Sequence, residues 1–123
     1  MAGYEERLVW RAARQLAGEV YNVSASAGFR GDRSLRDQLR RASISIPSNI
    51  AEGHQRKYRR DFARFLTISL GSVGEVRTQL YIAGDLGYLS PSEQRRLLEA
   101  FQQLAAGIER LRLVVLRQAD AGP

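Results

Sequence analysis

Apolar residues recur along this chain at intervals of three and four positions, which is the period of an α-helix. The pattern holds over four stretches, roughly residues 4–26, 33–53, 60–86 and 91–118. Alternation of apolar and polar residues, which marks a half-buried strand, does not run over any useful length. The links are short, and short links favour antiparallel neighbours. We therefore predict one all-α domain over residues 1–123, folded as an antiparallel up-down-up-down four-helix bundle.

The residues on these apolar stripes are the expected core. They are Leu8, Ala12, Leu16, Val20 and Val23; Leu35, Leu39, Ala42, Ile46, Ile50 and Gly53; Phe62, Phe65, Leu66, Ser69, Val73, Val76, Leu80 and Ala83; and Leu97, Phe101, Leu104, Ile108, Leu111 and Val115. In the last stretch the steps alternate between four and three residues, which is a heptad seam. Four large apolar side chains fall off the stripes, namely Trp10, Tyr21, Tyr81 and Leu113. They give some helices a second apolar surface, so we expect the protein to form a homo-oligomer.

Local residues mark where helices begin and end. Ser90 is a preferred N-cap, Pro91 suits the first helical position, and Glu93 completes a capping box. Gly53 is expected to stop the second helix, because glycine readily adopts the conformation that follows a helix. The next residues, HQRKYRR at 54–60, are expected to form a polar connector.

The second helix contains a proline inside the segment SISIPSNIAEG. Pro47 has no N–H to donate to the carbonyl of Ser43, and an interior proline costs about 3 kcal/mol unless something compensates. The hydroxyl groups of Ser43 and Ser45 stand beside the break and suit bonding to freed backbone groups. The helical period continues through the segment, so we predict one kinked helix. The alternative is a helix that ends near Ser45 and restarts with Pro47 at its first position.

Structural roles are expected for the rest of this segment. The side chains expected to pack are Ile44, Ile46, Ile50 and Ala51. Asn49 is expected either to satisfy backbone groups near the kink or to pair across an interface. Glu52 is expected to pair with an arginine of the connector.

The third helix carries small residues in the segment SLGSVGE, which includes Gly71, Ser72, Gly74 and Glu75. An interior glycine costs about 1 kcal/mol relative to alanine. Two of them indicate that another backbone passes close by, either within the bundle or in a second subunit. Glu75 is interpreted as a packed helix acid with an arginine partner and not as a general base.

The formal charge of +6 is concentrated in one part of the chain. Residues 30–64 hold ten basic and four acidic side chains, a difference of +6, so this window carries the whole excess. Such a field favours a polyanionic partner: nucleic acid, an anionic membrane surface or an acidic protein. All basic residues except Lys57 are arginine, which binds phosphate in bidentate fashion and stacks on bases. A GC-rich genome would produce the same bias.

Nine residues of this window are the candidate nucleic-acid-binding set. They are Arg40, Arg41, His54, Arg56, Lys57, Tyr58, Arg59, Arg60 and Arg64. The cations would contact phosphates and Tyr58 would stack on an unpaired base. The alternative is a solvated charged turn in which Arg59 or Arg60 pairs with Asp61 or Glu52.

Candidate catalytic chemistry is sparse. The chain has one histidine and no cysteine, so it offers no thiolate site, no His-based metal cluster and no paired Glu-x-x-His ligands. His54 has Ser43, Ser45 and Ser48 nearby in sequence, but a Ser-His pair also needs an orienting acid and an oxyanion hole. No phosphate-binding glycine loop is present. We expect no enzymatic activity, no cofactor and no metal, with His54 as a surface residue.

The remaining features bear on location. The absence of cysteine favours an intracellular protein. The first residues show no signal-peptide pattern, and no apolar run approaches the roughly 18 residues of a membrane span. We expect a cytoplasmic protein that does not enter a membrane.

Three segments together resemble a known family. They are SIPSNIAEG at 45–53, FARFLTISLGSVGE at 62–75 and LGYLS at 86–90. The chain resembles the bacterial four-helix bundle family also called the 23S ribosomal RNA intervening-sequence protein family. The accessory variability protein of diversity-generating retroelements is similar to this family. The resemblance implies the antiparallel bundle and a homopentamer around a central pore.

The resemblance also bears on function. The retroelement relatives are basic and bind nucleic acid and a reverse transcriptase, whereas stand-alone members have no established enzymatic activity. We therefore expect a non-enzymatic accessory protein that binds RNA or DNA phosphates through its basic surface. The alternative is a protein–protein scaffold that docks an acidic partner such as a polymerase or reverse transcriptase.

Overall fold

The computed structural model describes residues 3–121, and these residues form helices and no strand. The helices are α1 (Tyr4–Ser24), α2 (Ala27–Arg30), α3 (Arg33–His54), α4 (Arg59–Asp85) and α5 (Pro91–Asp120). The predicted all-α class is confirmed. None of these helices is both long and apolar enough to span a bilayer.

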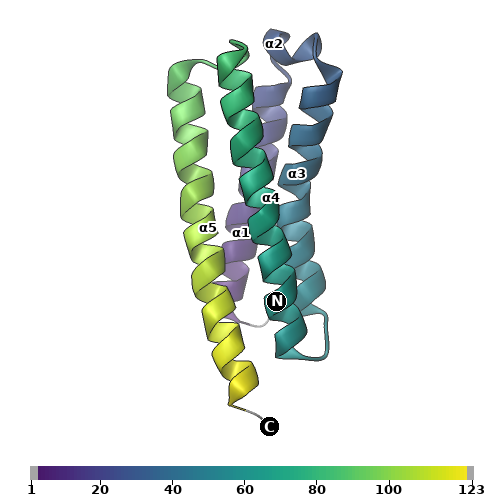
Figure 1. Ribbon diagram of the computed structural model, residues 1–123, viewed down its shortest axis with the longest axis vertical. Coiled ribbons are helices and arrows are strands. Elements are labelled where there is room, and N and C mark those ends of the chain that lie inside the picture. The colour runs from purple at the N-terminus through teal and green to yellow at the C-terminus, as the bar shows by residue number, and fades with distance from the viewer. Residues whose placement is uncertain (1–2, 122–123) are drawn as a thin grey trace.

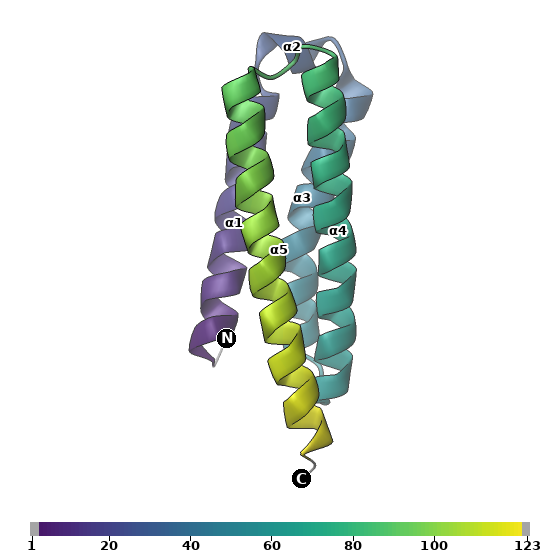
Figure 2. The same ribbon diagram turned by 60° about the vertical axis from the view of Figure 1, so that its left-hand side comes forward.

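The four long helices lie side by side and form one elongated helical bundle (Figure 1). In the same view α1 and α4 run from the end that holds the N-terminus toward α2, and α3 and α5 run back. The closest packing joins α3 to α4 and α4 to α5, whereas α1 and α5 pack least among the neighbouring long helices. Figure 2 shows α5 crossing in front of α1 and diverging from it toward the C-terminus.

The short helix α2 was not expected, because the Gly-rich segment after α1 suggested only a break. Phe29 of α2 is fully buried, and its ring lies 5.4 Å from that of Tyr88. Tyr88 donates a hydrogen bond to Asp32, whose second oxygen caps α3 by accepting from the N–H of Leu35 at 3.1 Å. Partial burial, and then the hydrogen bond and charge of Asp32, raise the pKa of Tyr88. This contact network closes the end of the bundle.

The predicted core stripes hold for α3, α4 and α5, where every residue named for them is buried. The stripe predicted for α1 is wrong at its start, because Leu8 is 45% exposed and Ala12 faces solvent. Ala13 and Ala17 face the core instead. The core face of α1 is therefore turned by about one residue from the predicted one. Its small alanine side chains made it hard to distinguish from the outer face in the sequence.

Pro47 lies inside a continuous helix, which confirms the prediction of one helix over its alternative. Ser43 donates its hydroxyl to the carbonyl of Arg40 at 2.8 Å. Asn49 donates to the carbonyl of Ser45 at 2.8 Å, as expected for a residue that satisfies backbone near the proline. The expectation that Ile44 packs is wrong, because that side chain is 43% exposed on the outer side of α3.

The interface between α3 and α4 depends on small residues. The hydroxyl groups of Ser45 and Ser72 lie 2.8 Å apart, and Ser69 donates to the carbonyl of Ile46 at 3.0 Å. A Cβ atom on Gly53 would lie 2.5 Å from Cβ of Phe65. Gly53 is therefore a packing residue and not the expected helix stop, and α3 continues to His54.

The two glycines of α4 have a different environment. A Cβ atom on Gly71 or Gly74 would meet nothing within 4 Å. The close approach expected at these glycines does not occur within the bundle. Glu75 on the same face is exposed and makes no ion pair within residues 3–121, so its expected packed role with an arginine partner is wrong.

Candidate nucleic-acid interface

The structure divides the predicted binding residues into two groups along α3. Thirteen residues separate Arg41 from His54, which is about 20 Å along a helix that rises about 1.5 Å per residue. The connector patch consists of Arg56, Lys57, Arg59, Arg60 and Arg64. The α3 patch consists of Arg30, Arg33, Arg36, Arg40 and Arg41. The expectation that Arg40 and Arg41 lie near the connector is therefore wrong.

In the connector patch, arginines lie over aromatic rings of the core. The guanidinium carbons of Arg56 and Arg64 stand 4.8 and 5.0 Å from the ring centroid of Phe65. Arg59 stands 5.1 Å from the centroid of Phe62. These contacts stabilise the position of each cation while its charge faces water.

Carboxylates partner most of this patch. Arg56 pairs with Glu52 at 3.0 Å, as expected. Arg60 pairs with Asp120 at 3.2 Å instead of with Asp61 or Glu52. Arg59 donates to Glu6 at 2.8 Å. The five cations of the connector patch and the four acids Glu6, Glu52, Asp61 and Asp120 sum to a formal charge of only +1.

Glu6 and His54 form a contact that the sequence did not predict. Glu6 is 7% exposed, and its Oε2 lies 3.0 Å from Nδ1 of His54, outside the direction in which a ring N–H would donate. His54 also packs edge-on against Phe62, so the expected surface position is wrong. The available signal was that Glu6, Ala13 and Val20 are spaced by seven residues on one face of α1.

The serines near His54 in sequence do not meet it. Ser43 donates to backbone and Ser45 bonds to Ser72 on the next helix. Within residues 3–121 no three side chains of the metal-ligating types gather closely enough to hold a metal ion. Tyr58 is 62% exposed beside an open hollow that Lys57 and Arg60 also line, so its ring is accessible for stacking.

The α3 patch has fewer partners. Asp32 and Asp37 lie within the same stretch of chain, and Glu75 of α4 lines one hollow together with Arg41, so five arginines and three acids leave a formal charge of +2. Arg36 lies 3.2 Å from Asp37. Arg33 and Arg41 make no ion pair with any residue that the structure describes. Arg30, Arg33 and Arg36 were absent from the predicted binding set, although the basic window had included them.

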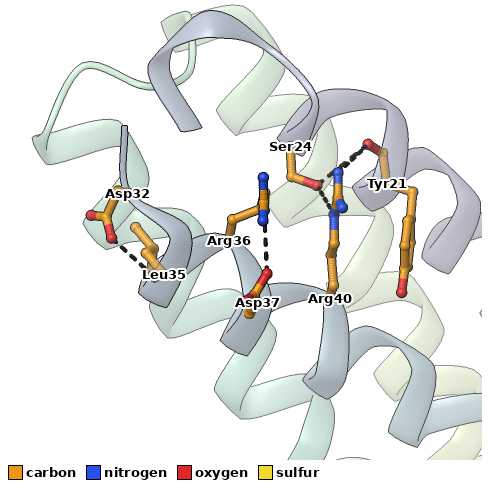
Figure 3. A network of polar contacts seen from close by, with 7 residues as sticks. All are labelled: Tyr21, Ser24, Asp32, Leu35, Arg36, Asp37 and Arg40. Atoms are coloured by element: carbon orange, nitrogen blue, oxygen red, sulfur yellow. Dashed lines mark hydrogen bonds and ion pairs between the residues drawn. The ribbon is translucent and has the colours of Figure 1, made fainter. Parts of the chain in front are cut away.

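Arg40 joins α3 to the end of α1. Its Nε donates to the hydroxyl of Ser24 at 2.7 Å, and Nη2 lies 3.4 Å from the carbonyl oxygen of Tyr21. The guanidinium lies 4.6 Å from the centroid of the Tyr21 ring (Figure 3). A cation is favourable at the C-terminal end of a helix, so Arg40 stabilises the packing of α1 as well as adding charge.

Two comparisons with known proteins found a match, one with a solved structure and one with a family model. A protein of unknown function from the S23 ribosomal protein family of Bacteroides thetaiotaomicron has a similar structure, with a TM-score of 0.81 and 18% sequence identity. The similarity covers 88% of this chain and 97% of that one, and at this identity it shows the fold alone. No curated protein matches the chain. The model of the 23S rRNA-intervening sequence protein family matches residues 5–110, and the chain belongs to that family.

Proposed function

We propose that this protein is a non-enzymatic, cytoplasmic accessory protein that binds the phosphates of RNA or DNA through its basic surface. One observation carries the proposal: the α3 patch keeps an excess of +2 after its neighbouring acids are counted, and Arg33 and Arg41 make no ion pair within residues 3–121. Guanidinium groups without an internal partner are free to bind phosphate oxygens. The connector patch adds a weaker field, since acids neutralise most of it.

Assembly is the second part of the proposal. We propose that antiparallel up-down-up-down bundles associate as a ring-like homo-oligomer, a pentamer as the family resemblance implies. The outer face of α4 supports this, because Gly71 and Gly74 leave room for another backbone beside exposed Ile68 and Tyr81. Repeating the basic patches around a ring would strengthen binding without any new type of contact.

A second candidate is a protein–protein scaffold that docks an acidic partner such as a reverse transcriptase or another polymerase. A hollow of about 360 Å³ between α1 and α5 favours it. Leu8, Val9 and Leu113 line this hollow, and its charged residues are Arg110, Arg117 and one acid, Glu5. An apolar surface rimmed with arginine suits an acidic protein segment better than it suits a nucleic-acid backbone.

A salt titration of binding tests the first candidate against the second. Labelled RNA, single-stranded DNA and duplex DNA are titrated with wild type, Arg33→Glu/Arg41→Glu and Arg56→Glu/Arg60→Glu. We expect log K to fall linearly with log salt, by about 0.7 to 0.9 per phosphate contact. The α3-patch variant should lose more affinity than the connector variant. Absence of binding by an intact wild-type oligomer at about 50 mM salt would reject the proposal and favour the scaffold.

A further inference from the structure

A hollow of about 350 Å³ opens between α1 and α3 within the α3 patch. Tyr21 of α1 lines it together with Asp37, Arg40, Arg41 and Ile44 of α3. Tyr21 and Ile44 are 40% and 43% exposed, so the hollow presents apolar surface to solvent beside strong charges. An aromatic ring, a carboxylate and guanidinium groups in one place match the base and the phosphate of a nucleotide.

The aromatic ring is held in place before any ligand arrives. Arg40 is tied to Ser24 and to the backbone of Tyr21, and it covers part of the ring at 4.6 Å (Figure 3). A side chain that is already ordered loses little conformational entropy when a ligand stacks on it. Tyr21 is therefore better prepared for stacking than Tyr58, which is 62% exposed and contacts the flexible side chain of Lys57.

The polar groups of the hollow suit the rest of a nucleotide. Oδ1 of Asp37 accepts from Arg36 at 3.2 Å, while Oδ2 has no hydrogen-bond donor within residues 3–121. A free carboxylate oxygen accepts from the amino group of cytosine, whereas uracil presents a carbonyl at the same position. Arg41 has no carboxylate partner in the described chain and is available to a phosphate.

We propose that this hollow binds one unpaired nucleotide of a nucleic-acid strand, an inference that rests on the proposed function. The base stacks on Tyr21, its amino group donates to Asp37, and its phosphate binds Arg41. A paired base cannot enter, because its faces and its pairing edge are occupied in a duplex. The site therefore selects single strands over duplexes, and amino-bearing bases over uracil or thymine.

The test measures binding of labelled oligocytidine, oligouridine and duplex RNA by fluorescence anisotropy at constant salt. Tyr21→Leu should weaken oligocytidine binding by about tenfold, since one base–aromatic stack is lost, and should leave duplex binding unchanged. Tyr21→Phe should retain wild-type affinity, which separates loss of stacking from misfolding. Tyr4→Leu is the matched control, because this tyrosine is 68% exposed and lies outside both basic patches, and it should have no such effect. Asp37→Ala should abolish the preference for oligocytidine over oligouridine without abolishing binding.

The outcomes separate this inference from the proposed function. If wild type binds strands and only Arg56→Glu/Arg60→Glu reduces that binding, the proposed function stands and the hollow is rejected. Equal effects of Tyr21→Leu and Tyr4→Leu, or equal affinity for oligocytidine and oligouridine, would also overturn the inference. Absence of any nucleic-acid binding would overturn both proposals. Free cytidine monophosphate is added as competitor, and competition at a concentration equal to the strand would assign the hollow to a free nucleotide instead of a strand.

Discussion

Both sides of α4 carry small residues, but these residues have different roles on the two sides. On the inner side, Ser69 and Ser72 bond to α3, and Gly53 of α3 receives the side chain of Phe65. On the outer side, Gly71 and Gly74 face empty space among exposed apolar residues, which are Ile68, Tyr81 and Ile82. Small residues on the inner side bring two helices of one bundle together.

This difference shows that glycines inside helices can have different structural roles. Glycine is required at position 53 because a Cβ atom there would lie only 2.5 Å from Cβ of Phe65. Gly71 has no such neighbour, so its helix-propensity cost of about 1 kcal/mol has no compensation inside one subunit. The unexplained cost on the outer face supports a contact with another subunit, whereas the inner face is complete by itself.

The largest expected effect is that of Gly53→Ala on stability. The added methyl would push Phe62 and Phe65 of α4 away from α3, and such overpacking costs about 1 to 3 kcal/mol. The gain in helix propensity, about 1 kcal/mol, offsets only part of it. Urea unfolding followed by circular dichroism measures the change. Gly18→Ala is the matched control, since nothing lies within 4 Å of that position, and a stability no lower than that of Gly18→Ala would contradict the close packing.

The next effect concerns the buried hydrogen bond of the inner face. Ser69→Ala removes the donor to the carbonyl of Ile46, and we expect a loss of about 1 kcal/mol in the free energy of unfolding. Thr78 also donates to a backbone carbonyl, but within its own exposed helix turn. Thr78→Ala should therefore leave stability nearly unchanged. Equal changes in the free energy of unfolding of the two variants would mean that the hydrogen bond between α3 and α4 adds no more stability than one within an exposed helix turn.

Sequence alone predicted the regular parts of the bundle because large apolar residues define them. The stripes of α3, α4 and α5 contain phenylalanine, leucine, isoleucine and valine at helical spacing, so their core faces could be identified. In the first half of α1 the core face is Ala13 and the buried Glu6, while Leu8 is a large apolar residue on the outer side. The turn of α2 is too short to show a period, and only its buried Phe29 reveals why it forms.

The candidate interface was less predictable because its partners lie far apart in the chain. Arg59 meets Glu6 and Gln118, which come from opposite ends of the sequence. The local charge window identified the basic surface but not which of its charges were already neutralised. Tyr21 was predicted only to lie off the core stripe on a second apolar surface, because its position beside Arg40 depends on how α1 packs against α3.

The smallest expected effect tests the outer face of α4 directly. Gly71→Ala and Gly18→Ala both replace an exposed helical glycine with nothing within 4 Å, so each should stabilise an isolated subunit by about 0.5 to 1 kcal/mol. If the outer face of α4 meets another subunit, the added methyl at Gly71 separates the two backbones and weakens assembly, while Gly18→Ala does not. Sedimentation equilibrium over a range of protein concentrations measures this difference.

A reduced association constant for Gly71→Ala alone would place the subunit contact on α4. Identical association of both variants and wild type would show that the outer glycines face solvent in the oligomer, and the apolar hollow between α1 and α5 would then be the better candidate for that contact.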